Sequence, residues 1–338
     1  MSSAASPLRI GQVLKGVKDV YVVAQKLHDQ VWSARSIQSC TASSAASDLC
    51  PPNSPSGYTA SQQQHQVVLK YAPETRLQRE KAILQQFAGD PYIRQLIDHG
   101  KEPSFLVLEH LDFDALRSSR RAKLARKDIK VIARSVLSAL KSLHVKGIAH
   151  TDIKPDNILL NFDSEGSSVV EAKLGDCGDA WDVGFDSNPQ GTRHAIGAAI
   201  FRSPEALFGL KWSTPTDIWS FGATLISLIW GRNFHIFKPG NVSADDGEFL
   251  VHVLIQQARY FGPFPLSYEM WLDKEQQQVL AAVHIHIEEQ DMRRPFLQAV
   301  DEEMTSGDRD FLCGIMKLDP RDRPTAEELL KSDWFDLP

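Results

Sequence analysis

Apolar side chains recur with the 3.6-residue period of an α-helix in three parts of the chain. The clearest stripe runs through residues 129–143 and is followed by Gly147, the residue type that most often ends a helix. Residues 74–87 carry a second stripe. Residues 215–230 are so largely apolar that we expect a buried helix there.

Strand patterns lie mainly in the first third of the chain. The stretch 13–35 reads as two strands joined near residues 28–30, and the stretch 92–111 reads as two more. Short β-branched or alternating runs predict strands at residues 21–27, 31–34, 67–71, 104–111, 158–161 and 169–174.

Composition narrows the classes of partner. A chain of 338 residues is longer than one small core usually holds, so we expect two lobes. The net charge of −6 at pH 7 argues against nucleic acid as the main partner. The first residues lack a signal-peptide pattern, and the longest apolar run, 223–230, is too short to cross a bilayer. We therefore expect no membrane attachment.

The four cysteines show no metal-ligand spacing. Cys40 and Cys50 lie in a polar stretch, whereas Cys177 and Cys313 lie in the part that we expect to be folded. Four free thiols are typical of a reducing compartment, so we expect an intracellular protein of the cytoplasm or nucleus.

Charged and polar clusters indicate solvated surface. Residues 36–66 are rich in Ser, Ala, Gln and Pro, which predicts a flexible insert. Basic residues gather at 117–127 and acidic residues at 245–248, 288–291 and 301–303. We interpret these clusters as solvated faces, although the first could bind a phosphate or an acidic partner and the others could attract a basic substrate.

The most informative segment is His150–Asn157. Pro155 and the polar residues predict a loop, which presents Asp152, Lys154 and Asn157 together. Phosphoryl transfer needs such a set. A carboxylate orients the attacking hydroxyl and accepts its proton, a cation offsets charge on the phosphoryl group, and an amide oxygen helps to hold Mg²⁺. Taken alone, the same pattern could be a polar turn between a helix and a strand.

This H-x-D-x-x-x-x-N spacing resembles the catalytic loop of protein kinases, H-R-D-L-x-x-x-N, which small-molecule kinases of the phosphotransferase type share in similar form. Four further kinase motifs follow in the right order. They resemble D-F-G, A-P-E, the D-x-W-S-x-G of the central helix and the closing motif, at residues 176–178, 203–205, 217–222 and 318–326. The chain therefore resembles the eukaryotic-type serine/threonine protein kinases.

That resemblance implies the α+β bilobal protein-kinase fold, with a small β-rich N-lobe and a large helical C-lobe. We expect an N-terminal tail at residues 1–12, the N-lobe at 13–111 with its flexible insert at 36–66, and the C-lobe at 112–338.

One charged pair follows from periodicity as well as from resemblance. Glu80 shares a helix face with Leu77 and Leu84, so its carboxylate points the same way as the apolar stripe. A buried acid needs a partner, and Lys70 on the strand 67–71 is the natural one. By resemblance, Lys70 binds the α and β phosphates of ATP and Glu80 fixes it.

The resemblance implies the other roles in the site. Asn157 and Asp176 would bind Mg²⁺, while Asp152 would be the catalytic base and Lys154 would neutralise the γ-phosphate. Backbone groups at residues 109 and 111 would bond the adenine edge. The residues implied in binding the nucleotide are Lys70, Glu80, Glu109, Leu111, Val31 and Leu159.

Four positions depart from the kinase pattern. The hairpin turn at 28–30, which in protein kinases forms a lid over the ATP phosphates, has no glycine here. Glycines normally let backbone N–H groups approach phosphate, so we expect weak nucleotide affinity or a different lid. Cys177 replaces Phe in D-F-G, which predicts looser packing. Ala198 stands where a threonine usually bridges the catalytic Asp and Lys. Thr151 replaces an Arg that reads an activation-loop phosphate, so we expect activity without that phosphorylation.

Three features resemble the serine/arginine-rich protein kinases: Thr151, the run 176–181 and the run 260–265. That resemblance suggests basic protein substrates. We interpret the chain as an ATP-dependent serine/threonine protein kinase that acts as a monomer. The alternative is a pseudokinase, a nucleotide-binding or scaffold module with little transfer. A small-molecule kinase fits less well, because Glu205 and Arg323 match protein-kinase motifs.

Overall fold

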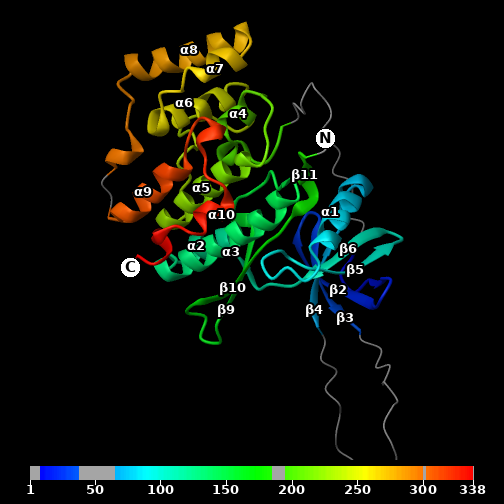
Figure 1. The fold of residues 1–338 in the computed structure, drawn as a ribbon. Helices are drawn as coiled ribbons and strands as arrows, with labels where there is room; N and C mark the ends of the chain where they lie inside the picture. The colour runs from blue at the N-terminus through cyan, green and yellow to red at the C-terminus, as the bar shows by residue number, and fades with distance from the viewer. Residues whose placement is uncertain (1–7, 38–64, 185–194, 300–301, 338) are drawn as a thin grey trace, which may run out of the picture. The chain divides into compact units, whose positions relative to one another are not determined.

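A computed structural model describes residues 8–37, 65–184, 195–299 and 302–337, which form two compact units (Figure 1). The smaller unit contains the chain up to Ala88 together with Gln95–His110, and the larger unit contains Gly89–Arg94 and the chain from Leu111 onward. Leu111 and residues 89–94, which the sequence placed in the N-lobe, belong to the larger unit. Residues 89–94 join it through the parallel bridge between Ile93 and Leu174.

The smaller unit is built on a six-stranded antiparallel sheet with the order β1-β2-β3-β4-β6-β5. Helix α1, Glu74–Gln86, packs against β5 and β6. The core contains Tyr21, Trp32, Leu69 and Phe105, all almost fully buried. The strands are β1 Val13–Lys15, β2 Val20–His28, β3 Val31–Ser36, β4 Gln66–Lys70, β5 Leu96–Lys101 and β6 Ser104–Glu109.

Two strand predictions need correction here. The stretch 13–35 holds three strands rather than two, because the three-residue β1 is too short to show a period. The predicted insert 36–66 is narrower at its ends, since Ser36 closes β3 and Gln66 opens β4. Residues 38–64 of that insert lie outside the described residues.

The larger unit is mainly helical, and its helices carry the periodic stripes seen in the sequence. The predicted stripes at 129–143 and 215–230 lie in α3 and α5, and α5 is buried on nearly all sides. The helices are α2 Ala115–Arg121, α3 Arg126–Val145, α4 Pro204–Leu207, α5 Pro215–Trp230, α6 Phe249–Phe261, α7 Ser267–Trp271, α8 Lys274–Glu289, α9 Ser306–Ile315 and α10 Ala326–Leu329.

Two small sheets complete the larger unit. One has the order β10-β9-β7 and the other pairs β11 with β8. Their strands are β7 Phe113–Asp114, β8 Ile148–Ala149, β9 Ile158–Phe162, β10 Val169–Leu174 and β11 Trp181–Asp182. The loop expected at 150–157 lies between β8 and β9 and contains a 3-10 turn at Pro155–Asn157.

The α+β class is therefore confirmed, with one β-rich unit and one helical unit (Figure 1). Within the part of the chain that the structure describes, every helix is too short or too polar to span a bilayer.

Candidate active site

In the smaller unit, a lysine and a glutamate form a buried ion pair. The Lys70 Nζ lies 2.7 Å from the Glu80 Oε2, and the two side chains are 8% and 1% exposed. Lys70 is the last residue of β4, and Glu80 lies on the buried face of α1 beside Leu77 and Leu84. The amphipathic period of α1 thus turns the carboxylate toward the sheet, where the ammonium compensates its burial.

The lid of the smaller unit is a tight hairpin. The register of β2 with β3 places His28 opposite Val31, so only Asp29 and Gln30 form the turn. The Asp29 carboxylate accepts a hydrogen bond from Lys26 Nζ at 3.0 Å, and this bond lowers its pKa. The tip therefore presents an anionic side chain in place of the glycine N–H groups that usually face phosphate.

In the larger unit, two polar side chains of the loop bond the carboxylate of Asp152. The Lys154 Nζ donates to Asp152 Oδ2 at 2.9 Å, and the Asn157 Nδ2 donates to the same oxygen at 2.9 Å. Asn157 also donates to the backbone oxygen of Asp152 at 2.8 Å. These bonds fix the carboxylate of Asp152 between a cation and an amide. They leave Oδ1 of Asn157, a possible metal ligand, outside the contacts.

Asp217 of α5 holds the loop by its backbone. Its Oδ2 accepts from the N–H of His150 at 2.7 Å and its Oδ1 accepts from the N–H of Thr151 at 2.8 Å. His144 of α3 lies 3.0 Å from Oδ2 through its Nε2. The carboxylate is fully buried, so α5 and α3 together determine where the loop sits.

Thr151 has an unusual backbone conformation. Its φ of 71° lies in the left-handed region, which a β-branched residue adopts only at a cost of about 1–3 kcal/mol. The bond from the Thr151 N–H to Asp217 and a bond from Thr151 Oγ1 to the Asp179 carbonyl oxygen at 2.9 Å offset this strain. The hydroxyl thereby links the loop to the segment that follows Asp176.

The register of β9 with β10 brings the two expected metal ligands together. Ile158 pairs with Leu174, so Asn157 and Asp176 come from neighbouring strand ends. The Gly175 N–H donates to the backbone carbonyl oxygen of Asn157 at 2.8 Å. Asp176 has φ 57°, and its side chain accepts from the Gly178 N–H at 3.3 Å. One carboxylate and one amide oxygen are hard ligands that fit Mg²⁺, the remaining positions being left to phosphate and water.

The residues expected at the nucleotide base belong to both units. Val31 pairs with Lys70 in the sheet, and the Glu109 N–H donates to the Gln95 oxygen at 3.0 Å. Leu111 and Leu159 belong to the larger unit, the first buried and the second half-buried on β9.

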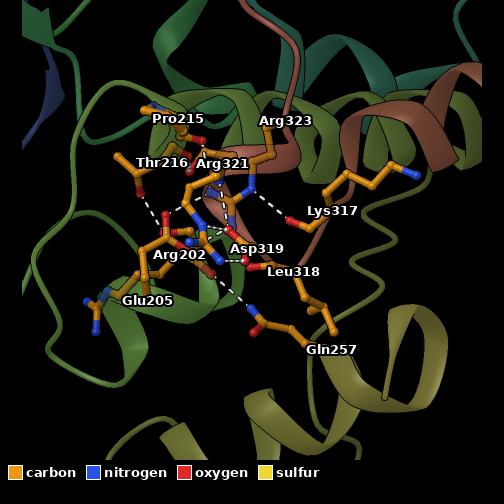
Figure 2. A network of polar contacts seen from close by, with 12 residues as sticks. Arg202, Glu205, Pro215, Thr216, Gln257, Lys317, Leu318, Asp319, Arg321 and Arg323 are labelled. Carbon is orange, nitrogen blue, oxygen red and sulfur yellow. Dashed lines mark hydrogen bonds and ion pairs between the residues drawn. The ribbon is translucent and has the colours of Figure 1, made fainter. Parts of the chain in front are cut away.

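A buried ion pair links the end of the 203–205 motif to the closing motif (Figure 2). The guanidinium of Arg323 donates to both carboxylate oxygens of Glu205, each at 2.7 Å. The two side chains are 0% and 2% exposed. Arg323 also donates to backbone oxygens of Lys317, Pro215 and Leu318. This contact ties α4 to the start of α5 and to the 3-10 turn after Leu318.

Two residues just before the 203–205 motif, Gly197 and Arg202, lie close to the loop. Gly197 has φ 54°, and a Cβ there would lie 2.5 Å from the Thr151 oxygen and 3.3 Å from the Asp152 Oδ1. Arg202 donates to the oxygens of Ile196 and Gly197, and its pKa is lowered by burial, an effect that Asp152 opposes. Their only signal in the sequence is their position just before the 203–205 motif.

Other expected features are placed as follows. Cys177 is fully buried behind Asp176, and Ala198 begins the turn before α4 without a hydroxyl to offer. Four of the six residues of the basic cluster at 117–127 have protein partners: Arg120 bonds Asn233, Lys123 pairs with Glu303, Arg126 pairs with Asp308 and Lys127 bonds Ser168. Residues 185–194 of the expected activation segment lie outside the described residues.

Comparison with known proteins gives one family and several distant relatives. Residues 59–335 match the family described as "Protein kinase domain". Dual specificity protein kinase lkh1 of Schizosaccharomyces pombe is 31% identical over 36% of this chain and 19% of its own length. Two proteins of Arabidopsis thaliana cover more. Cyclin-dependent kinase G1 is 26% identical over 72% of this chain and 38% of its own, and cyclin-dependent kinase D-1 is 27% identical over 76% and 59%. This chain thus spans less than two thirds of each relative.

Proposed function

Because the chain belongs to the protein kinase domain family, we propose that it transfers the γ-phosphate of ATP to serine or threonine hydroxyls of proteins. The observation that carries the proposal is the arrangement around Asp152. Lys154 and Asn157 both bond its Oδ2, so the carboxylate is held in one orientation beside a fixed cation. Such positioning, with electrostatic stabilisation, supplies most of the rate in phosphoryl transfer.

The chemistry proposed for these residues is an in-line displacement. The substrate hydroxyl oxygen attacks the γ-phosphorus, the bond from that phosphorus to the β–γ bridging oxygen breaks, and ADP leaves. Asp152 accepts the hydroxyl proton, and Lys154 stabilises negative charge on the transferred group. Lys70, held by Glu80, binds the α and β phosphates.

The donor set of the larger unit fits Mg²⁺, which we propose as the metal. Asn157 and Asp176 hold it. When bound, Mg²⁺ neutralises the charge of the phosphate oxygens. The turn at 28–30 contributes no glycine N–H groups and carries the Asp29 carboxylate, so we propose weaker ATP binding than a glycine-rich lid provides.

Replacing the proposed base tests this function. Asp152→Asn keeps the size of the side chain and removes its basicity, so phosphotransfer should fall by about 10²–10⁴-fold while ATP binding remains. Asp156→Asn, an exposed carboxylate in the same loop, is the matched control and should transfer normally. The measurement is transfer of labelled phosphate from ATP to a serine-containing protein, with ATP binding followed by thermal stabilisation. Undiminished transfer by Asp152→Asn would remove Asp152 from this role.

The glycine-free turn is the observation that favours the pseudokinase alternative. The comparisons give that alternative no support, since each relative named above is called a kinase. The ordered set of Lys70, Glu80, Asp152, Asn157 and Asp176 also argues against it, because a module without chemistry needs no such arrangement. ATP binding without transfer to any protein substrate would restore the alternative.

We further propose that the kinase is active without phosphorylation of its activation segment. Thr151 occupies the position of the phosphate-reading Arg, and its hydroxyl bonds the Asp179 oxygen, so a neutral contact already joins the two segments. This residue and the runs 176–181 and 260–265 support a grouping with the serine/arginine-rich protein kinases, a grouping that the relatives named above do not confirm. Phosphatase treatment of active enzyme should leave turnover unchanged, and its loss would refute the idea.

The acidic clusters are a weak reason to propose a basic substrate. Glu288 pairs with Arg293 at 2.6 Å, Glu303 pairs with Lys123, and Asp246 accepts from the Glu248 N–H. These carboxylates are engaged in local contacts. We therefore propose protein substrates without a stated charge. We also propose that the protein is a monomer in a reducing intracellular compartment.

A further inference from the structure

A glutamine lies on the apolar face of α6 in the larger unit. Gln257 follows Leu254 by three residues and precedes Phe261 by four, so the period of the helix turns it inward with those side chains. It is fully buried, with 0% of its surface exposed. This helix packs against α4 and against the 3-10 turn Ala199–Phe201. An amide therefore occupies a place where the helix pattern favours an aliphatic side chain.

The amide of Gln257 makes one directed contact. Its Nε2 donates to the backbone oxygen of Arg202 at 2.9 Å (Figure 2). A carbonyl oxygen can only accept, so this bond turns the amide nitrogen toward Arg202 and the Oε1 atom away. Oε1 is buried and meets no protein donor among the described residues. A buried acceptor of this kind lowers stability, so the bond to Arg202 is what glutamine offers over an aliphatic side chain.

The backbone before α4 is held at three consecutive residues. The Ser220 hydroxyl of α5 donates to the Phe201 oxygen at 2.8 Å. The hydroxyls of Ser203 and Thr216, the second also on α5, share a hydrogen bond of 2.6 Å. Gln257 holds the residue between these two from the side of α6. Two helices thus fix this short stretch, and loss of the Gln257 bond would release its middle residue from one of them.

The side chain of Arg202 connects this stretch to the loop at 150–157. Its Nε donates to the Ile196 oxygen at 2.6 Å and its Nη2 donates to the Gly197 oxygen at 2.9 Å. Gly197 abuts the loop, since a Cβ there would lie 3.3 Å from the Asp152 Oδ1. A shift of the Arg202 backbone would therefore displace the segment that lies beside the carboxylate of Asp152.

We propose that Gln257 is a positioning residue for protein substrates, because its bond to Arg202 sets residues 196–200 beside Asp152. The proposal rests on the proposed function, since it concerns the side of that site which receives the substrate chain. Residues 197–199 are one glycine and two alanines, all half-buried, and they present little besides backbone. The position of that backbone decides how closely a substrate hydroxyl approaches Asp152.

Gln257→Met tests the bond, because methionine keeps the length of the side chain and removes the N–H donor. The substrate is a pool of peptides with a single serine between random flanks. We expect the KM for this pool to rise about three- to tenfold, the change that one lost hydrogen bond gives. The KM for ATP should not change, because none of the residues proposed to bind ATP takes part in these contacts. Gln257→Asn keeps an amide but shortens its reach, and should show the same rise.

The matched control is Gln276→Met. Gln276 Nε2 also donates to a backbone oxygen of the larger unit, that of Phe208, at 2.7 Å. The Phe208 oxygen belongs to the residue that follows α4, beyond the stretch that Gln257 holds. The control variant should therefore leave the KM for the peptide pool and the KM for ATP as they are in the wild type.

Hydrogen–deuterium exchange measures the positioning without any phosphotransfer. The amides of Phe201 and Arg202 close the 3-10 turn before α4, with N···O distances of 2.9 and 3.2 Å. In Gln257→Met these two amides should exchange about three- to tenfold faster than in the wild type. Gln276→Met should leave their exchange unchanged. Exchange within α5 is followed in the same samples, and wild-type values there show that the unit remains folded.

The outcomes separate this proposal from the proposed function. Unchanged exchange of the two amides in Gln257→Met would overturn the proposal. Faster exchange with an unchanged KM for the peptide pool would also overturn it, because the bond would then be structural alone, and so would an equal rise in the KM for ATP. Faster exchange in a protein whose wild type transfers no phosphate would refute the kinase function and leave the hold of Gln257 on the segment intact.

Discussion

Removing Arg323 should destabilise the larger unit more than removal of any exposed arginine. Its guanidinium makes five hydrogen bonds, two to Glu205 and one each to backbone oxygens of Lys317, Pro215 and Leu318 (Figure 2). Arg323→Met keeps much of the apolar volume but leaves the Glu205 carboxylate buried without its cation. Breaking a buried ion pair in this way costs about 3–5 kcal/mol.

A control variant separates the free-energy cost of the orphaned Glu205 carboxylate from the cost of losing an arginine charge. Arg321→Met is the matched control, because the Arg321 side chain is 63% exposed and pairs with Asp319 at 2.7 Å. It should cost about 1 kcal/mol or less. Adding Glu205→Leu to Arg323→Met removes the orphaned carboxylate and should recover much of the loss, since apolar replacements of a buried pair are often nearly neutral.

The assay is urea unfolding followed by tryptophan fluorescence. Six of the seven tryptophans belong to the larger unit, and one of them, Trp219, has its ring 5.3 Å from the Arg323 guanidinium. The signal therefore reports on the unit that contains the pair. If Arg323→Met lost no more stability than Arg321→Met, or if the double replacement were worse than the single one, the reasoning about an orphaned buried charge would be wrong.

Three further results are expected. Thr151→Ala loses the hydroxyl bond to the Asp179 oxygen, worth about 1 kcal/mol, and should lower kcat, whereas Thr151→Ser should retain it; equal kcat values would contradict a role for that bond. Gly197→Ala places a Cβ against the loop and should reduce phosphotransfer beyond the loss in Gly209→Ala, which has a similar positive φ but open space around it, and equal losses would show that only backbone strain matters. The Asp319 pKa is lowered to about 2, chiefly by the hydrogen bond from Arg321, so its contribution to stability is present above pH 4 and lost as pH falls toward 2. Acid unfolding of Asp319→Asn should lack this part of the pH dependence, and an unchanged acid limb would argue against it.

Much of the local structure could be predicted because it depends on neighbouring residues. The stripes at 129–143 and 215–230 lie in α3 and α5, and the acid on the apolar face of α1 does meet Lys70. The loop at 150–157 forms between two strands, with Asp152, Lys154 and Asn157 in direct contact. Each of these features follows from a period or a spacing within about twenty residues, where chain geometry limits the possible contacts.

The features that sequence reasoning missed depend on contacts across long separations. A Cβ at Gly197 would lie 2.5 Å from the Thr151 carbonyl oxygen, so the need for glycine depends on a segment distant in the sequence. The three-residue β1 exists only because β2 offers it a partner.

The amino-acid sequence by itself indicated which residues are candidates for the chemistry and which segments become helices or strands. Side-chain periodicity and short motifs contain that information. Only the tertiary structure decided how these segments meet: Asp217 reaches the backbone of Thr151 across 66 positions, and Arg323 reaches Glu205 across 118. The physical reason is that a buried charge must find a partner wherever packing brings one, and packing is a property of the whole unit.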